Sequence, residues 1–400
     1  MNALKRQFFL SYAVIGSVMP LMTVFLREQG GFNYLQLGIA SSLMGLPMLF
    51  SPILLTLFAD RNIDPRRILA IAFSLSSVVL TSIYFSDRIE LILILYFFHG
   101  LSFVAMLPLQ DGFYFSLTEQ YRKENQPLTE YPFVRVWGTI GFILPSLLLF
   151  IPLKNGADPG SILPVAVMFC LLSLANSFTL PLLNRRIIEV TAKRQIPTRT
   201  AFARLYSPEG RWLAVGIFFG LWAASTYYVF IANYMDEVIE IPRQYIGIIF
   251  NIGVTFEIGY SLLMPWLQRK IGLKSIISLG LGLMSLRMLL LALFPNPVVA
   301  VAVQIMHGLE VLALFIAPPM FVNRLAGDEY RNSMQGVYTM SVGGCSRVIA
   351  GCTAGLAIMN GNLKNGLFMG AALAFIGFLV ITILFGRIPP RSEQQISESE

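Results

Sequence analysis

Residues 284–311, MSLRMLLLALFPNPVVAVAVQIMHGLEV, combine two long apolar runs with three ionisable side chains. The pattern predicts two apolar helices joined by a proline-rich turn at 295–297. Arg287 lies near the middle of the first helix, and His307 and Glu310 lie near the middle of the second. His307 and Glu310 are three residues apart, so they are expected to share one helix face.

A fourth ionisable residue lies one apolar run upstream. Glu257 is the only charged residue between Arg243 and Arg269. An ionisable side chain at bilayer depth costs several kcal/mol unless it is paired or hydrated, so it predicts a functional site. We therefore expect two acids, one arginine and one histidine to form a cluster across three consecutive helices. The rest of the chain would be the scaffold that holds this cluster between two aqueous compartments.

The composition predicts an all-α membrane protein. The chain has 400 residues, is 56% hydrophobic and 13% charged, and has a mean hydropathy of +0.68. A soluble domain carries about twice that charged fraction. The net charge of +7 does not indicate a nucleic-acid partner, because the basic residues lie in short connectors between apolar runs. The three cysteines lie inside apolar runs without CxxC spacing and are interpreted as small buried hydrophobes.

A transmembrane helix needs about 20 mostly apolar residues, and twelve segments meet this length. The segments are 7–26, 35–59, 68–86, 90–117, 134–152, 161–183, 212–235, 244–267, 275–294, 298–323, 333–358 and 366–386. The first begins like a signal peptide, but it is long enough to span and no small-residue cleavage site follows it. We therefore interpret it as the first transmembrane helix.

One long connector divides the chain. Residues 184–211 form a strongly basic linker, which separates an N-terminal six-helix half (1–183) from a C-terminal six-helix half (212–386). The polar tail 387–400 is predicted to be disordered. Cytoplasmic connectors of membrane proteins are enriched in Lys and Arg. Most of the 29 Lys and Arg residues lie in connectors on one side, so both termini and the linker are predicted to be cytoplasmic in an inner (plasma) membrane protein.

A short internal repeat agrees with this division. HGLSFVAMLPL at 99–109 recurs as HGLEVLALFIA at 307–317, in the fourth segment of each half. Two parallel halves with a substrate site between them are one known transporter architecture. In segment 333–358, Gly351 and Gly355 have the small-residue spacing of closely packed membrane helices. The same segment carries Arg347, an intramembrane arginine with no evident partner.

The segment LLTLFADRNIDPRR at 54–67 resembles the cytoplasmic motif of the major facilitator superfamily. Asp60, Arg61, Arg66 and Arg67 match that motif, although its glycines are absent. The resemblance implies twelve transmembrane helices, and it implies that these four residues form a gate between the halves at the cytoplasmic face. It also implies a transporter that works by alternating access as a monomer.

Within the superfamily, the chain is most similar to the lactose permease and phenylpropionate permease group of proton symporters. The motifs that carry this similarity are MSLR around Arg287, HGLEV around His307, Glu257 before PWLQRKIGLK, YPFVRVWGTIGF around Arg135 and PLQDGF around Asp111. The order of the charges implies proton coupling. The sugar-binding residues of the lactose permease match less well. Phe115 stands in place of its glutamate and Phe142 in place of its stacking tryptophan, so a disaccharide substrate is disfavoured.

The charge balance of the cluster leads to a coupling hypothesis. Two carboxylates and one guanidinium are least costly when one carboxylate is protonated and the other is paired with Arg287. We expect Glu310 to carry the transported proton and Arg287 to favour its release. His307 would hydrogen-bond either Glu310 or the substrate, and Glu257 would link substrate occupancy to protonation. The alternative is a static ion-pair network that fixes the helix register.

Four residues are candidate substrate contacts: Glu257, Arg135, Asp111 and Phe142. Arg135 would bind a carboxylate or hydroxyl groups, or would serve only as a positive anchor at a helix end. Asp111 has two candidate partners, Arg135 and Arg347. Phe142 would stack on a substrate ring, or simply face lipid or a neighbouring helix.

The sequence thus predicts proton-coupled symport of a small organic solute, such as a sugar, a nucleoside or an aromatic acid. A proton-driven exporter and a non-transporting membrane sensor are the alternatives. An enzyme is not expected, because the chain has no HExxH, GxSxG or Walker motif. No metal or cofactor is expected, and the proton would be the coupling ion.

Overall fold

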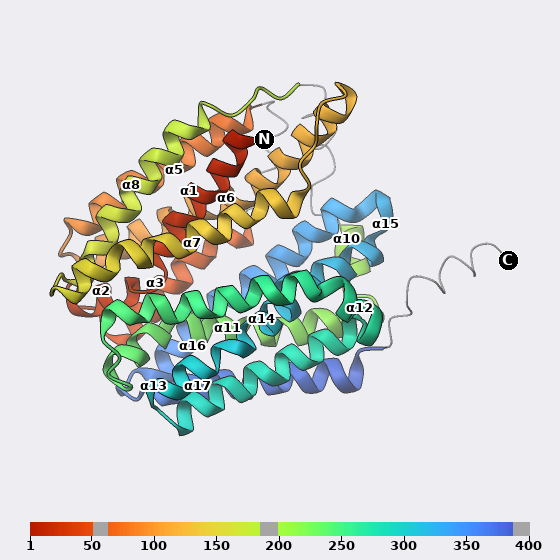
Figure 1. Cartoon of the computed structure of the whole chain (residues 1–400). Coiled ribbons are helices and arrows are strands. Elements are labelled where there is room, and N and C mark those ends of the chain that lie inside the picture. Colours follow the sequence, from red (N-terminus) through yellow and green to blue (C-terminus); the bar gives the residue numbers. More distant parts are fainter. Residues whose placement is uncertain (51–62, 185–198, 387–400) are drawn as a thin grey trace.

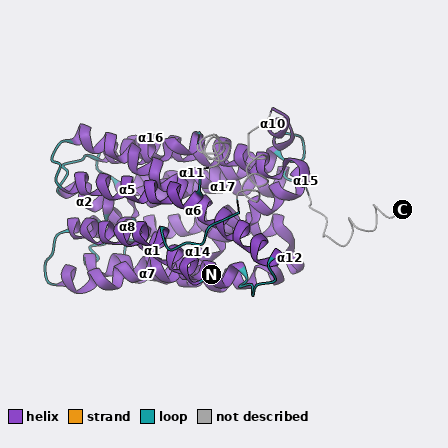
Figure 2. Ribbon diagram, turned by 90° about the horizontal axis from the view of Figure 1, so that it is seen from above, coloured by secondary structure: helices purple, strands orange, loops and turns teal. Residues whose placement is uncertain are grey.

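The computed structural model describes residues 1–50, 63–184 and 199–386. Within them every regular element is a helix (Figure 1). Two helical bundles lie side by side, the N-terminal bundle in red to yellow and the C-terminal bundle in green to blue (Figure 1). Seen from above, the helices of both bundles run in broadly the same direction (Figure 2). The predicted tail 387–400, the gate residues Asp60 and Arg61, and residues 185–198 of the linker lie outside the described residues.

Two helices of the N-terminal bundle begin at a residue whose side chain caps the helix. Asn33 caps α3 by accepting a hydrogen bond from the backbone of Gln36, and Asp64 caps α5, which begins with Pro65. Such side-chain caps satisfy backbone N–H groups that a helix start leaves free. The elements are α1 (Asn2–Val18), α2 (Met22–Glu28), α3 (Tyr34–Gly45), η1 (Leu46–Leu49), α5 (Pro65–Tyr84), α6 (Ile89–Lys123), α7 (Tyr131–Lys154), η2 (Pro159–Ser161) and α8 (Ile162–Ser177).

The C-terminal bundle contains three π-helical segments, η3, η4 and η5. Two of its helices begin at a capping asparagine, Asn296 before α13 and Asn362 before α17. The elements are α10 (Arg199–Leu205), α11 (Arg211–Glu237), α12 (Arg243–Leu293), α13 (Pro297–Ala302), α14 (Gln304–Val311), η3 (Leu312–Ile316), α15 (Ala317–Tyr338), η4 (Thr339–Gly344), α16 (Cys345–Ile358), α17 (Leu363–Leu379) and η5 (Val380–Leu384).

Ten helices in the described residues are long and apolar enough to cross a membrane. One of them, α12, has 51 residues and would be roughly 75 Å long, well beyond the 30 Å core of a bilayer. Its backbone is interrupted at Gly272, where φ is 76° and ψ is 165°. The break lies between the predicted segments 244–267 and 275–294. The predicted all-α membrane fold is thus confirmed at the level of a multi-helix membrane protein.

The two halves meet closely along α3 and α16. A Cβ atom on Gly38 of α3 would lie 2.2 Å from the carbonyl oxygen of Gly351 and 2.9 Å from Cα of Gly355, so only glycine permits this approach. The predicted close packing at Gly351 and Gly355 is confirmed. A second contact joins α7 and α12, where the Asn251 side chain donates to the carbonyl of Ile143 at 3.2 Å.

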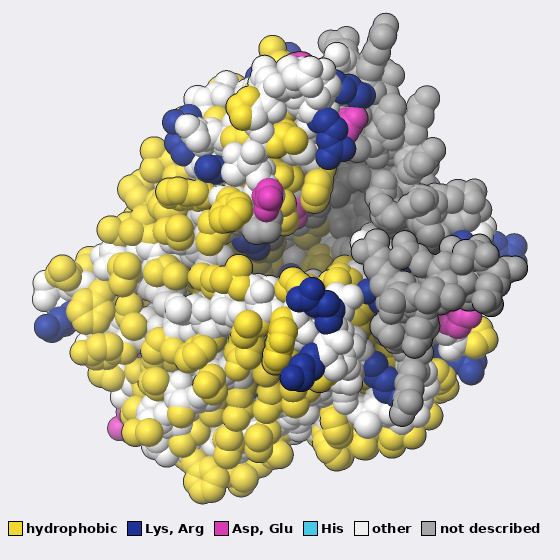
Figure 3. All heavy atoms as spheres, turned by 45° about the vertical axis from the view of Figure 1, so that its right-hand side comes forward, with side chains coloured by type: hydrophobic (Ala, Val, Ile, Leu, Met, Phe, Trp, Pro, Cys, Tyr) yellow, Lys and Arg dark blue, Asp and Glu magenta, His cyan; other side chains and the backbone are white. Residues whose placement is uncertain are grey.

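The two ends of the molecule differ. We call the end that holds α2 and the α11–α12 connection the hairpin end, and the end that holds Met1 and α10 the linker end (Figure 1). At the hairpin end, Arg243 of α12 pairs with Asp236 of α11 and with Glu28 of α2, so it joins the two halves. Towards the linker end, the surface is hollowed between the halves, and acidic and basic side chains border the hollow (Figure 3).

Candidate functional site

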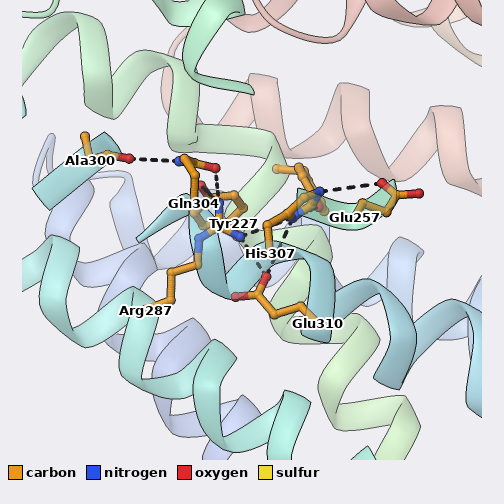
Figure 4. Close-up of polar contacts among 8 residues, drawn as sticks. Tyr227, Glu257, Arg287, Ala300, Gln304, His307 and Glu310 are labelled. Atoms are coloured by element: carbon orange, nitrogen blue, oxygen red, sulfur yellow. Dashed lines mark hydrogen bonds and ion pairs between the residues drawn. The ribbon is translucent and has the colours of Figure 1, made fainter. Parts of the chain in front are cut away.

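Arg287 of α12 is the centre of a buried polar cluster in the C-terminal half. Its guanidinium donates to Glu310 Oε2 at 2.7 Å, to Tyr227 Oη at 2.6 Å and to Gln304 Oε1 at 2.9 Å (Figure 4). It also lies 4.5 Å from the centre of the Tyr227 ring. The Arg287 and Glu310 side chains are 3% and 7% exposed. The structure therefore brings the predicted pair together away from solvent.

The chain positions this cluster by close packing of α14 on both arms of α12. A Cβ atom on Gly308 would lie 2.8 Å from the carbonyl oxygen of Phe256, on the first arm. A Cβ atom on Gly280, on the second arm, would lie 2.6 Å from the carbonyl oxygen of Leu309. The π-helical segment η3 follows directly after α14, and π-helical turns are frequent at functional sites.

His307 links the two acids of the cluster. Its Nδ1 lies 3.4 Å from an Arg287 nitrogen and 3.4 Å from Tyr228 Oη. Because a guanidinium can only donate, the contact with Arg287 favours Nδ1 as an acceptor, with the ring proton on Nε2. Nε2 lies 3.9 Å from Glu257 Oε2, and Nδ1 lies 3.9 Å from Glu310 Oε2. The imidazole thus stands between the two carboxylates.

Glu257 differs from Glu310 in its exposure. Its side chain is 30% exposed, against 7% for Glu310. Among the described residues, His307 is its one ion-pair neighbour, at 3.9 Å. Arg135 of the N-terminal half lies within electrostatic range of it. Glu257 is therefore the more accessible of the two carboxylates in the cluster.

Two buried atoms of the Arg287–Glu310 pair have no hydrogen-bond partner among the described residues, Glu310 Oε1 and Arg287 Nε. The pair is thus held by a single contact through Oε2 rather than by a two-pronged one. An unpaired polar atom in a buried site carries a desolvation penalty. Glu310 Oε1 consequently offers a place where a proton can bind without displacing another donor.

The predicted substrate contacts of the N-terminal half lie on α6 and α7. Arg135 stacks over the Tyr12 ring of α1, at 4.1 Å from the ring centre. Asp111 accepts a hydrogen bond from Tyr131 at 2.7 Å. Neither Arg135 nor Arg347, its two candidate partners, forms an ion pair with it in the described part of the chain. Arg135 is within electrostatic range of Asp111.

Phe142 offers little ring surface in this conformation, because the residue is only 8% exposed. Its backbone faces α1, where a Cβ atom on Gly16 would lie 2.1 Å from the Phe142 carbonyl oxygen. Stacking of a substrate on this ring stays a prediction.

The predicted cytoplasmic gate is only partly described, because Asp60 and Arg61 fall outside the described residues. Arg66 pairs with Asp64 at 2.7 Å and donates to the carbonyl of Leu180 at 3.0 Å. Burial opposes ionisation of Asp64, but its hydrogen bonds to Arg66 outweigh burial and hold the pKa of Asp64 below its usual value. Arg67 is exposed. Both contacts of Arg66 lie within the N-terminal half.

Several residues of the site were not predicted. Tyr227, Tyr228 and Gln304 surround Arg287 and His307, yet they are neutral residues whose facing a sequence does not show. The bridge from Arg243 to Glu28 was also missed. The sequence did contain a signal for it. The predicted outer connectors carry few charges, so Glu28 and Arg243 could have been expected to pair.

Comparison with known protein families places the chain in one of them. Residues 1–368 match the model described as the MFS_1 like family. The chain belongs to this family of the major facilitator superfamily. Two curated relatives from Escherichia coli (strain K12) match along most of their length. The nucleoside permease NupG is 21% identical over 94% of this chain and 93% of its own, and the xanthosine permease is 21% identical over 89% and 87%.

A solved structure of the same relative supports the fold. The crystal structure of the nucleoside transporter NupG superimposes with a TM-score of 0.81 at 19% identity, covering 97% of this chain and 99% of that one. The predicted membership of the major facilitator superfamily is thus confirmed. The chain is an integral membrane protein that transports small organic solutes, and the prediction of a transporter rather than an enzyme is confirmed by these permeases.

Proposed function

We propose that this protein is a proton-coupled symporter for nucleosides or closely related solutes. The observation that carries the proposal is the path from a reachable acid to a buried ion pair. Glu257 meets His307, and His307 meets the Arg287–Glu310 pair, all within 4 Å. The relatives with nearly full coverage transport a nucleoside and xanthosine by name, which favours nucleosides among the predicted solutes.

We infer twelve transmembrane helices in two six-helix halves, 1–183 and 212–386. The length of α12 and its break at Gly272 support counting it as two spans. The short apolar helix Tyr34–Leu49 supports a further span. The bias of Lys and Arg supports a cytoplasmic linker end, with both termini inside. The molecule would act as a monomer.

In this orientation the structure corresponds to an inward-facing state. The hairpin end would face outward and is closed by Arg243, which joins Glu28 and Asp236. A second contact from Tyr34 to Glu237 joins the halves at the same end. The hollow between the halves lies towards the linker end (Figure 3). Alternating access would then require these outer contacts to break.

The state of Glu310 fits the inward-facing step of a proton cycle. Its carboxylate is ion-paired with Arg287, and that pairing stabilises the ionised form from which the proton has already left. In the outward-facing state, we propose that a proton binds Glu310 Oε1 and neutralises the carboxylate. The neutral acid no longer needs Arg287 as a counter-charge. When the linker end opens, the pair forms again and the proton is released to the cytoplasm.

Glu257 would link the binding of substrate to the protonation of Glu310. A carboxylate accepts hydrogen bonds from the hydroxyl groups of a ribose, and the Arg135 guanidinium can donate to the same solute from the opposite half. A solute bound to Glu257 changes the partner of His307 Nε2. Because Nδ1 of the same ring faces Arg287, this change alters the electrostatic environment of the Arg287–Glu310 pair.

The test is uptake of labelled uridine and inosine into proteoliposomes under an imposed pH gradient. Uptake should accelerate when the outside is more acidic, and a protonophore should abolish that acceleration. Accumulation only when the interior is more acidic would instead indicate the exporter. A transport rate that does not depend on the pH gradient would contradict proton coupling. Nucleoside binding without transport would indicate a sensor.

A further inference from the structure

Arg347 of α16 is a charged side chain inside a membrane segment, and it has no role in the proposed cycle. It lies about midway along the predicted segment 333–358. Its terminal nitrogen contacts Met48 Sδ of η1 at 3.4 Å, and its side chain packs over Gly45 of α3, where a Cβ atom would lie 2.7 Å from Arg347 Cγ. A thioether is a weak acceptor and does not balance a positive charge.

The other two arginines of the interior each have an acid nearby. Arg287 is paired with Glu310 at 2.7 Å, and Arg135 lies within electrostatic range of Asp111 and Glu257. No carboxylate in the described part of the chain lies within ion-pair distance of Arg347. Leaving a guanidinium without a counter-charge at this depth is costly, so an anion from outside the described chain would stabilise it.

The position of Arg347 ties it to the coupling cluster. Tyr228 lies within electrostatic range of its guanidinium, and Tyr228 Oη lies 3.4 Å from His307 Nδ1. Arg347 is thus one tyrosine away from the histidine, and it contacts the opposite half through Met48. The π-helical segment η4 comes directly before α16 and ends three residues before Arg347, just as η3 begins two residues after Glu310.

We propose that Arg347 binds an acidic group of the transported solute, so that the preferred substrates are nucleoside-sized molecules carrying a negative charge. This inference rests on the proposed transport function. A guanidinium presents a planar fork of donors that matches a carboxylate or another delocalised oxyanion in a two-pronged contact. Xanthosine, whose base ionises more readily than that of inosine, is such a molecule. An aromatic carboxylate of similar size is another.

The test compares solutes that differ only in the acidic group. Binding to the purified full-length protein is measured by the shift in thermal unfolding for xanthosine against inosine at pH 8, and for 3-phenylpropionate against 3-phenylpropanol. Wild type should bind at least one acidic member about tenfold or more tightly than its neutral partner, as a charge-assisted hydrogen bond provides. Arg347→Gln should lose this preference, and Arg347→Lys should retain part of it.

Arg88→Gln is the matched control, because it removes the same charge from an exposed position just before α6. It should leave the preference unchanged. The proposal is overturned if wild type shows no preference for either acidic member, or if Arg347→Gln keeps the preference. The absence of a preference in wild type can be measured even if the Arg347→Gln variant does not fold. If Arg347→Gln keeps the preference for acidic solutes while inosine uptake stays proton-driven, only the proposed role of Arg347 is refuted. If wild type binds acidic solutes selectively but takes up none, the transport proposal is refuted instead.

Discussion

Charge removal at the buried Arg287–Glu310 pair should produce a specific pattern of unfolding free energies. Breaking a buried ion pair from one side costs about 3–5 kcal/mol. Glu310→Gln leaves the 3%-exposed guanidinium without its counter-charge. Arg287→Gln also removes the donor to Tyr227 and to Gln304, and each orphaned acceptor adds about 1 kcal/mol. The arginine variant should therefore be the less stable of the two, by about 2 kcal/mol.

The double variant completes the cycle. With both charges gone, neither is left unpaired, so its loss of stability should be at least about 2 kcal/mol smaller than the sum of the two single losses. Unfolding of the purified proteins by SDS in mixed micelles, followed through tryptophan fluorescence, provides the four free energies. Strictly additive losses, or a Glu310→Gln loss below about 1 kcal/mol, would refute the ion pair on which the coupling scheme depends.

Three further variants test other parts of the structure. Arg243→Gln should open the hairpin end and raise the labelling rate of a cysteine placed at Ser17 by about two- to fivefold, since partly exposed ion pairs contribute about 0.2–1 kcal/mol. An unchanged rate would exclude this bridge as an outer gate. Glu257→Gln should raise the KM for nucleoside exchange by about tenfold or more, the contribution of one hydrogen bond to a charged group, and an unaltered KM in counterflow would remove Glu257 from the binding site. Gly351→Val should destabilise the protein by about 1–3 kcal/mol because its side chain meets a carbonyl of α3. In the same thermal unfolding assay Gly343→Ala, whose Cβ would meet Met48 Cε at 3.5 Å, should behave like wild type, and equal effects of the two changes would contradict the packing.

The sequence was informative where a charge interrupts an apolar run. Arg287, Glu257 and the His307–Glu310 face stood out because membrane helices exclude ionisable groups unless they are used. Their mutual distance could be anticipated from helix periodicity for His307 and Glu310 alone. That the three helices converge required the fold.

Neutral and structural details could not be obtained in the same way. Tyr227 and Gln304 resemble many other polar residues of membrane helices, and only packing shows that they complete the shell of Arg287. The predicted continuous segment 7–26 is interrupted in the structure between α1 and α2, near Pro20, whereas α12 continues through the predicted connector to a break at Gly272. Pro20 and Gly272 lie at these two breaks, but proline and glycine also occur inside continuous membrane helices, so the sequence alone does not locate the breaks.

In the proposed cycle, Glu310 carries the proton that accompanies the solute. The most direct test of this role is the movement of protons when a nucleoside is added to proteoliposomes, recorded with a pH electrode for wild type and for Glu310→Gln. Wild type should make the outside medium more alkaline, while the variant should move no protons yet still exchange labelled nucleoside across the membrane. Proton movement that persists in Glu310→Gln, or nucleoside transport by wild type without proton movement, would contradict this role.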